Sequence, residues 1–290
     1  MQFFTTQLLN GLTSGVVYAM LAVGYSLVYG ILQQINFAHG YVYMFGTFVT
    51  ASLITSGCPL WLAIVAGLAA GAVIAIGVER FAYRPVRGNR LAPTVTAVGV
   101  GLIIENVARL IWTSKIRPMP FPFQADIIRL GPVVLSPLQI VVAVVGLAMA
   151  AFLWIIITKT DLGRGMRAVK DDLATAELMG VPVDRVVVTV YVLGALFGVV
   201  GGILYGAYYN TLSVTMGFSG TLNAFTATVI GGIGSVWGAF AGGLLLGVLQ
   251  AMVTGYVSSA LLNTVTFGLL IAFLLFRPTG IAGVQVASRP

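Results

Sequence analysis

The chain has 290 residues, of which 59% are hydrophobic and 8% are charged, and its net charge is +7. Ordinary globular domains carry about 25% charged residues, so this composition excludes a water-soluble domain and indicates a chain embedded in a lipid bilayer. The positive charge does not indicate a nucleic-acid-binding protein, because the basic residues lie next to apolar stretches, as is usual in membrane proteins.

The charges are confined to a few segments. No Lys, Arg, Asp or Glu precedes Glu79, and residues 130–158 and 186–276 are also free of charge. A helix needs about 20 apolar residues to cross a bilayer, so the sequence predicts an all-α polytopic membrane protein with about eight or nine crossings. The predicted crossings are Leu8–Leu32, Tyr41–Ser56, Leu60–Phe81, Ala92–Trp112, Pro137–Ile157, Val186–Tyr208, Trp237–Tyr256 and Ser258–Phe276, with the shorter Leu222–Ile233 as the ninth.

The first polar interruption of the apolar pattern is Gln33–Gly40, which contains Asn36 and the only histidine of the chain, His39. Polar groups at membrane depth are tolerated where they line a cavity or pair inside the protein. Broken or re-entrant helices at such places often form transport sites. We therefore expect Asn36, His39 and Gly40 to lie on a solute path; a loop at the membrane surface is the alternative.

A second group of polar residues lies inside the predicted crossing Ala92–Trp112. Glu105 and Arg109 are at positions i and i+4, so their side chains can pair on one helix face. Together with Asn106, this segment is suited to recognise a charged or zwitterionic solute. The alternatives are a structural ion pair, or an Arg109 side chain that extends to the membrane surface. We count Glu105 and Asn106 among the candidate substrate-path residues.

The basic loops predict the orientation, because cytoplasmic loops are enriched in Lys and Arg. Residues 79–90 hold four arginines and one acidic residue, and residues 159–185 form a second charged loop, so both are expected in the cytoplasm. The segment 113–136 then lies outside, and its four prolines exclude a regular helix. Arg277 favours a cytoplasmic C-terminus, which requires the ninth crossing; the side of the N-terminus is left open.

The loop 159–185 is predicted to contain a short helix. Asp171 or Asp172 is a good N-cap, and Gly180 followed by Pro182 ends the helix. Its residues Leu173, Ala176 and Met179 are expected to share one face, an apolar stripe with no core of its own chain beside it. Such a stripe requires either a protein partner or the headgroup surface of the bilayer, and the spacing favours neither.

Glycine occurs 36 times and has two expected roles. The cluster Gly231, Gly232 and Gly234 does not suit a helix interior, so a hinge or an unwound turn is expected there. Other glycines recur at i and i+4, which places a flat strip on one helix face where helices pack closely. These pairs are Gly11/Gly15, Gly67/Gly71, Gly194/Gly198/Gly202/Gly206 and Gly234/Gly238/Gly242.

The sequence contains no pattern that indicates an enzyme. None of its lysines follows a glycine, which excludes a phosphate-binding G-x-x-x-x-G-K-[ST] loop. With one His, one Cys and few carboxylates, neither a metal-ligand cluster nor a nucleophilic triad is visible. We expect no catalytic site, no metal and no cofactor, so any ATP hydrolysis must take place on another chain.

Five segments carry a family resemblance: Asn10–Gly40, Arg80–Val100, Gly163–Val181, Phe225–Val248 and Phe276–Gly283. They resemble the permeases of branched-chain amino acid ABC importers of the LivH type, and the similarity covers almost the entire chain. The motif INFAHG at residues 35–40 together with GGIGS at residues 231–235 is highly specific for this group. Urea and short-amide permeases share much of the pattern, so the resemblance defines the family more closely than the solute.

The resemblance implies one transmembrane permease domain, residues 1–290, in the bacterial inner membrane. It implies that a coupling helix in residues 159–185 docks into an ATPase, and that Asn36, His39 and Gly40 lie near the translocation path. The implied partners are two ABC ATPase subunits, a second homologous permease forming a heterodimer, a periplasmic or lipid-anchored solute-binding protein and the lipid bilayer. The candidate coupling-helix residues are Asp172, Leu173, Ala176, Glu177, Met179 and Gly180.

The implied solute is leucine, isoleucine or valine. The alternative within transporters is urea or a short-chain amide. The alternative from another class is a channel or facilitator that works without ATPases, against which the loop 159–185 argues, because such a pore has no use for a coupling helix.

Overall fold

The computed structural model describes residues 2–86, 92–122, 128–130, 133–277 and 279–282. Within these ranges, seven helical segments are long and apolar enough to cross a membrane, as expected for a polytopic membrane protein. They are α1 (Gln2–Leu32), α3 with the turns that follow it (Leu60–Val86), α4 (Ala92–Trp112), α5 (Pro137–Lys159), α8 (Val183–Tyr209), α10 (Val236–Tyr256), and α11 with the turn that precedes it (Ser259–Phe276).

Two further helices are shorter than a full crossing. α2 (His39–Thr55) has 17 residues and α9 (Met216–Gly231) has 16. At about 1.5 Å per residue they are about 26 and 24 Å long, against a hydrocarbon core of about 30 Å. The predicted segment Leu222–Ile233 is wrong in its bounds. The helix begins earlier, and it stops before Gly232, whose φ of +115° lies outside the helical region.

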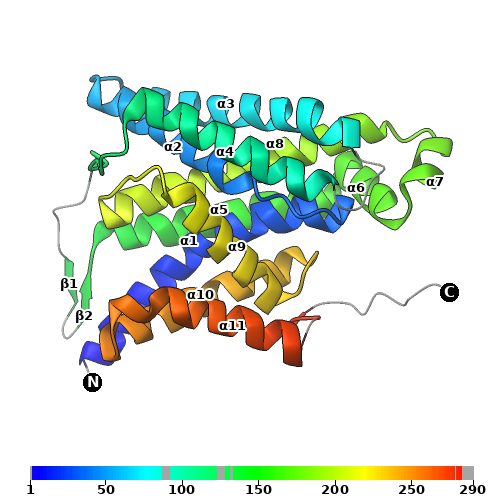
Figure 1. Cartoon of the computed structure of the whole chain (residues 1–290). Coiled ribbons are helices and arrows are strands. Elements are labelled where there is room, and N and C mark those ends of the chain that lie inside the picture. The colour runs from blue at the N-terminus through cyan, green and yellow to red at the C-terminus, as the bar shows by residue number, and fades with distance from the viewer. Residues whose placement is uncertain (1, 87–91, 123–127, 131–132, 278, 283–290) are drawn as a thin grey trace.

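The connection between α5 and α8 contains two helices that project beyond one end of the long helices, α6 (Asp161–Asp171) and α7 (Leu173–Leu178) (Figure 1). The turns that follow α3 lie at the same end, where Arg84 forms an ion pair with Asp184. The two loops that were predicted to be cytoplasmic therefore lie together.

The N-terminus lies at the opposite end of the molecule (Figure 1). That end also carries an antiparallel hairpin, β1 (Ile128–Leu130) and β2 (Val133–Leu135), which departs from the all-α prediction. The described part of the proline-rich segment 113–136 is non-helical up to α5, as expected. It is joined to the chain after α8 by backbone hydrogen bonds between Arg117 and Leu212.

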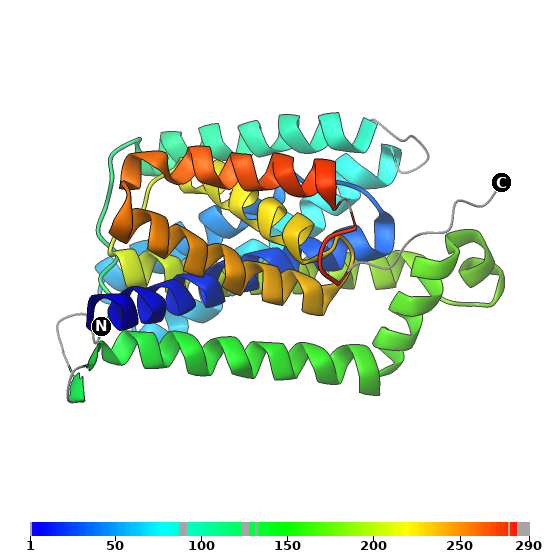
Figure 2. The ribbon, with the colours of Figure 1, turned by 90° about the horizontal axis from the view of Figure 1, so that it is seen from below.

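The helices α1 and α8 form the centre of the bundle, and α5 and α11 lie on its outside. In the most apolar windows of α1 and α8, 78% and 72% of the residues are buried, against 17% for α5 and 11% for α11. Figure 2 shows α5 running along one edge of the bundle. Since the outer helices bury so little surface in this chain, lipid or other subunits must cover them.

The close packing of α1 rests on glycine, as the spacing predicts. A Cβ atom at Gly11 would lie 2.7 Å from the Cα atom of Val248 on α10, and one at Gly15 would lie 2.8 Å from that of Leu244. Where α1 crosses α8, a Cβ atom at Gly24 would lie 2.6 Å from the carbonyl oxygen of Gly194. Small residues let the helix backbones approach in this way.

Candidate translocation and coupling sites

Asn36 lies in the break between α1 and α2, where it holds the start of α2. α1 ends at Leu32, and Gln33 adopts a positive φ of 52°. The Asn36 side chain is buried, and its Oδ1 accepts hydrogen bonds from the backbone N–H of Ala38 at 3.0 Å and from the hydroxyl of Tyr83 at 2.9 Å. Asn36 therefore links the residue that precedes α2 to the helical turns that follow α3, and it is buried rather than in a surface loop.

His39, the first residue of α2, is packed inside the bundle. It is 3% exposed and lies between two glycines, since Cβ atoms at Gly24 and Gly198 would each approach its imidazole ring to between 3.0 and 3.3 Å. The ring of Tyr25 meets it edge to face with the centroids 6.1 Å apart. Its Nε2 atom has no hydrogen-bond partner within the described ranges. This buried imidazole nitrogen is a free polar group next to the helix break.

Gly40 lies where the two short helices meet. A Cβ atom there would overlap the hydroxyl of Thr221 and the carbonyl oxygen of Gly217, both in α9. Tyr43, one turn further along α2, donates a hydrogen bond to the carbonyl oxygen of Met216. The first turns of α2 and α9 therefore pack directly on each other, so that both helices begin at the same level inside the bundle.

The second candidate group on α4 adjoins the first. Glu105 is buried and pairs with Arg109, whose side chain is 44% exposed. Tyr41, which follows Gly40, lies against α4, where a Cβ atom at Gly101 would approach its ring to 2.6 Å and where its hydroxyl is near the Glu105 side chain. Asn106 instead points out of the bundle, where its Nδ2 donates to the carbonyl oxygen of Leu102 at 2.8 Å. The structure thus brings Gly40 and Glu105 together through Tyr41, which the sequence patterns missed.

At the other end of α9, the glycine cluster forms the expected turn. Gly232 and Gly234 have positive φ angles of 115° and 81°, and a Cβ atom at Gly231 would overlap the carbonyl group of Gly238. The chain after α11 returns to this point, where the N–H of Ile281 donates to the carbonyl oxygen of Ile230 at 2.9 Å. The break at this position is confirmed; whether it works as a hinge is a separate proposal.

The loop 159–185 contains two helices, of which the sequence predicted only the second. α6 begins where the Thr160 hydroxyl accepts a hydrogen bond from the N–H of Gly163. α7 begins where the Asp172 carboxylate accepts from the N–H of Thr175 at 2.6 Å, as predicted, and it ends before Gly180, whose φ is +80°. The N-cap and the end of α7 therefore lie at the residues that the sequence predicts.

The predicted apolar face of α7 is wrong in one residue. Ala176 is only 4% exposed, because α7 packs with this face against α6 and α8. Leu178 and Met179 are 88% and 79% exposed, and Leu173 is partly exposed. The outward apolar surface of α7 is therefore Leu178 and Met179, with Leu173 beside them. The sequence did not predict the exposure of Leu178, because α7 has only six residues and its faces are defined by the helices that pack against it.

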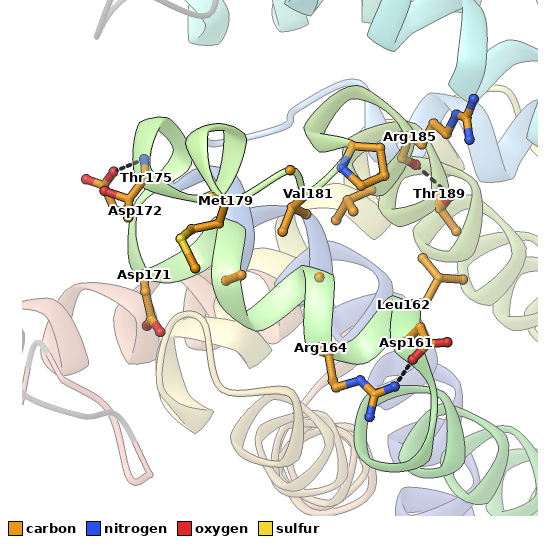
Figure 3. Close-up of a pocket in the computed structure, with 16 residues that line it drawn as sticks. Asp161, Leu162, Arg164, Asp171, Asp172, Thr175, Met179, Val181, Arg185 and Thr189 are labelled. Atoms are coloured by element: carbon orange, nitrogen blue, oxygen red, sulfur yellow. Dashed lines mark hydrogen bonds and ion pairs between the residues drawn. The ribbon is translucent and has the colours of Figure 1, made fainter.

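A pocket of about 910 Å³ lies between α6, α7 and the start of α8 (Figure 3). Its walls combine apolar side chains such as Met179 and Val181 with charged ones, among them Asp171 and Arg185. Another of its charged residues, Arg164, is already paired with Asp161. The pocket is therefore a mixed polar and apolar recess at the tip of the molecule. Within the described residues, no group of His, Cys, Asp and Glu side chains is placed to hold a metal ion.

Comparisons with known proteins agree with this architecture. The family model described as "Branched-chain amino acid transport system / permease component" matches residues 7–276. The permease protein BraD of Pseudomonas aeruginosa, from a high-affinity branched-chain amino acid transport system, is 38% identical, over 97% of this chain and 96% of its own. LivH of Escherichia coli, a permease protein of such a system, is also 38% identical, with the same coverage of both chains.

More distant relatives include the fructose import permease protein FruG of Bifidobacterium longum, which is 25% identical over 77% of this chain and 68% of its own. Among solved structures, PsaBC from Streptococcus pneumoniae in complex with Fab matches with a TM-score of 0.51 at 16% identity, over 93% of this chain and 91% of that chain. That likeness concerns the fold alone. The chain is a multi-pass membrane protein and a transport subunit, and it belongs to the family of permease components of branched-chain amino acid transport systems.

Proposed function

We propose that this chain is the permease subunit of an ABC importer that carries leucine, isoleucine and valine across the bacterial inner membrane. The observation that carries the proposal is the similarity to BraD and LivH over 97% of the chain, which exceeds the similarity to the fructose permease FruG in both identity and coverage. Urea or a short-chain amide is the alternative solute, and a facilitator without ATPases is the alternative mechanism.

Nine crossings and a single permease domain, residues 1–290, are part of the proposal. The seven long helices together with α2 and α9 make nine passages. An odd number agrees with the N-terminus and the end of α11 lying at opposite ends of the molecule (Figure 1). The N-terminus is then external, and α6 and α7 are cytoplasmic. The short helices are mostly buried, so the rest of the protein covers their ends.

The coupling surface of the proposal is the tip formed by α6 and α7. Its outward residues Leu178 and Met179 are 88% and 79% exposed among the residues that the structure describes, and large exposed apolar side chains in water indicate a binding surface. We assign this surface to one of two ATPase subunits. Asp172 and Gly180 set the ends of α7, Leu173 and Glu177 flank the contact, and Ala176 anchors the helix to its own chain.

The solute path of the proposal runs along the junction of α2, α4 and α9, facing a second, homologous permease in a heterodimer. Gly40 and Glu105 lie at this junction, and Asn106 is exposed next to it. Asn36 and His39 lie directly behind it, where they set the position of α2. The glycines at 231, 232 and 234 form the hinge that lets α9 move against α10. A periplasmic or lipid-anchored binding protein delivers the solute.

Deletion of the chain from its host, combined with uptake assays, tests the proposal. We expect uptake of radiolabelled leucine, isoleucine and valine to fall, while uptake of urea and fructose stays unchanged. An affinity-tagged permease should also co-purify an ATPase. If the deletion strain lost uptake of urea alone, the assignment of branched-chain amino acids as the solute would be wrong. If the tagged permease supported uptake but co-purified no ATPase, the chain would be a facilitator rather than an importer subunit.

A further inference from the structure

Three polar side chains from α9, α10 and α11 meet inside the bundle, at a place that belongs neither to the solute path nor to the coupling surface proposed above. Gln250 of α10 is 8% exposed and Thr266 of α11 is 5% exposed, and Asn223 of α9 lies beside them, partly buried. The Nε2 atom of Gln250 donates to Oδ1 of Asn223 at 3.1 Å and to the hydroxyl oxygen of Thr266 at 2.8 Å. We call these three residues the Gln250 clamp.

The clamp depends on the side-chain amide of Gln250. Its nitrogen carries two hydrogens, of which one is directed to α9 and the other to α11. The hydroxyl of Thr266 donates its own hydrogen to the carbonyl oxygen of Leu262 at 2.9 Å, so its oxygen acts as the acceptor towards Gln250. Leucine at position 250, which has no donor, would therefore release α9 and α11 at once.

The clamp lies at a distance from the turn that joins α9 to α10. At that turn the two helix backbones touch, since a Cβ atom at Gly231 would overlap the carbonyl oxygen of Gly238, and one at Gly242 would overlap that of Ala227. Asn223 lies two turns of helix before Gly231, about 12 Å along α9. A rotation of α9 by about 15° about the turn would move Asn223 by about 3 Å, which is enough to break its hydrogen bond. Movement of α9 about this turn therefore requires the clamp to open.

A polar group on the same face of α9 indicates a second position of this helix. Thr226 is three residues after Asn223, so the two side chains share one helix face. It is 1% exposed, and its hydroxyl has no hydrogen-bond partner within the described residues. The hydroxyls of Thr221 and Thr228 each donate instead to a carbonyl oxygen of α9 at 2.8 Å. Buried polar groups without a partner are rare and unfavourable. The observed position of α9 thus satisfies Asn223 but not Thr226, as expected for one of two positions.

We propose that Gln250 is a positioning residue for transport. The clamp holds α9 against α10 and α11 in the position seen here (Figure 1), and it opens when α9 turns about the glycines at 231, 232 and 234. The inference rests on the proposed function, which includes this hinge. A hydrogen bond between membrane helices typically changes an equilibrium constant by about threefold, so two such bonds favour one position of α9 without preventing the other.

Pulsed EPR between two spin labels on the complete transporter tests the clamp. The labels are attached at Phe218→Cys on α9 and Tyr256→Cys on α10, both exposed positions, in a Cys58→Ser background. Thr266→Val removes one acceptor while nearly keeping the side-chain shape, and it should raise the ratio of a second α9–α10 distance to the first by about threefold. Gln250→Leu removes both donors and should raise this ratio by about ninefold.

Two further variants distinguish the clamp from general loss of packing. Thr266→Ser keeps the hydroxyl and should give the distance distribution of the unmodified protein. Gln139→Leu is the matched control, because Gln139 is 9% exposed and donates a hydrogen bond at 2.9 Å to Asn10, between α5 and α1, which the proposal does not move. The control should leave the α9–α10 distances unchanged even where it lowers the unfolding temperature.

Transport by the same variants gives a readout that a purely structural role would not change. Lost stability would lower ATP hydrolysis and leucine uptake together. An open clamp should instead raise the number of ATP molecules hydrolysed per leucine carried, by about threefold in Thr266→Val, because α9 then changes position without solute. Thr266→Val keeps the test decisive if Gln250→Leu does not assemble.

Unchanged distances in Thr266→Val and Gln250→Leu would overturn the proposal, and so would an equal change in Gln139→Leu. Measurements on the unmodified protein with and without ATP separate the clamp from the proposed function. If the variants shift the distances but ATP does not, the clamp is correct and the ATP-driven importer is wrong. If ATP shifts the distances but the variants do not, the importer is supported and the clamp is wrong.

Discussion

At the scale of single residues, the break between α1 and α2 depends on Asn36. One acceptor atom, its Oδ1, satisfies both the N–H of Ala38 and the hydroxyl of Tyr83. Buried donors that lose their acceptor cost about 1–3 kcal/mol each. The position of α2 relative to the turns after α3 is therefore sensitive to this side chain.

A double-mutant cycle between Asn36 and Tyr83 measures this link. Asn36→Leu should lower the free energy of unfolding by about 2 kcal/mol or more, because it leaves two buried donors unsatisfied. Tyr83→Phe should lower it by about 1 kcal/mol, and the double variant should lose less than the sum of the two. Unfolding in detergent, followed by tryptophan fluorescence, gives the values. Strict additivity would show that the two side chains do not interact.

His39 offers a second test at this scale. Leucine is close to histidine in size, so His39→Leu should keep the packing between Gly24 and Gly198 and should leave the protein assembled. If the imidazole takes part in transport, uptake of leucine should fall at least severalfold while the amount of permease in the membrane is unchanged. Normal uptake and solute preference in this variant would restrict His39 to a packing role.

At the scale of helices, the crossing of α1 and α8 needs glycine at both contact points. A Cβ atom at Gly24 would lie 2.6 Å from the carbonyl oxygen of Gly194, and one at Gly194 would lie 2.8 Å from that of Gly24. Because the obstacle in each case is backbone rather than a flexible side chain, the helices must separate to admit a methyl group. These two helices are also the most buried of the bundle, so the separation would affect most of the core.

Gly24→Ala should therefore lower the free energy of unfolding by about 1–3 kcal/mol or more, which is the range for overpacking of a core. Gly99→Ala in α4 is the matched control, because nothing lies within 4 Å of a Cβ atom at that position. The control should be neutral or stabilising by about 0.5–1 kcal/mol, since alanine favours helix over glycine. Thermal unfolding of both variants in the same detergent measures the difference. Equal unfolding temperatures for Gly24→Ala and Gly99→Ala would contradict the close crossing of α1 and α8.

The coupling helix α7 is the other element whose faces matter. Its inward residue Ala176 and its outward residues Leu178 and Met179 belong to different surfaces. Substitutions on the two faces should therefore have different effects, one on the folding of the tip and the other on the contact with the ATPase.

Leu178→Ala and Met179→Ala should weaken co-purification of the ATPase and lower uptake, with central contacts costing roughly 2 kcal/mol each. The stability of the permease itself should not change, because these side chains are exposed. Ala176→Glu should destabilise the tip, since it places a charge against α6 and α8. Leu110→Ala, which removes an equally exposed side chain from α4, is the control. ATPase binding at the unmodified level in both outward variants would mean that α7 docks elsewhere.

At the scale of the whole molecule, the charged loops and the arrangement of the helices both distinguish one end of the bundle from the other. The turns after α3, the helices α6 and α7 and the end of α11 lie at one end, and the N-terminus and the hairpin lie at the other (Figure 1). The basic loops predict that the first end is cytoplasmic. If α2 and α9 both pass through the membrane, as we propose, the N-terminus is external.

Single cysteines in a Cys58→Ser background test this orientation. Ser114 and Phe3 are exposed near the end that we assign to the outside, and Thr175 is exposed on α7. In intact cells, Ser114→Cys and Phe3→Cys should react with a membrane-impermeant thiol reagent, and Thr175→Cys should react only after the cells are broken. The reverse pattern would invert the molecule, and protection of Phe3→Cys alone would show an even number of crossings.

The sequence alone determined the membrane character, most helix positions and the family. The crossing at Ala92–Trp112, the N-cap Asp172 and the glycine turn at 232–234 appear where the pattern predicts them, because each depends on local hydropathy, a cap or a backbone angle. The tertiary structure alone decided which side chains meet. That α2 and α9 begin against each other, that Tyr41 joins Gly40 to Glu105, and that Ala176 faces inward all depend on contacts between distant segments. Such contacts follow from how the helices pack, which periodicity within one helix does not encode.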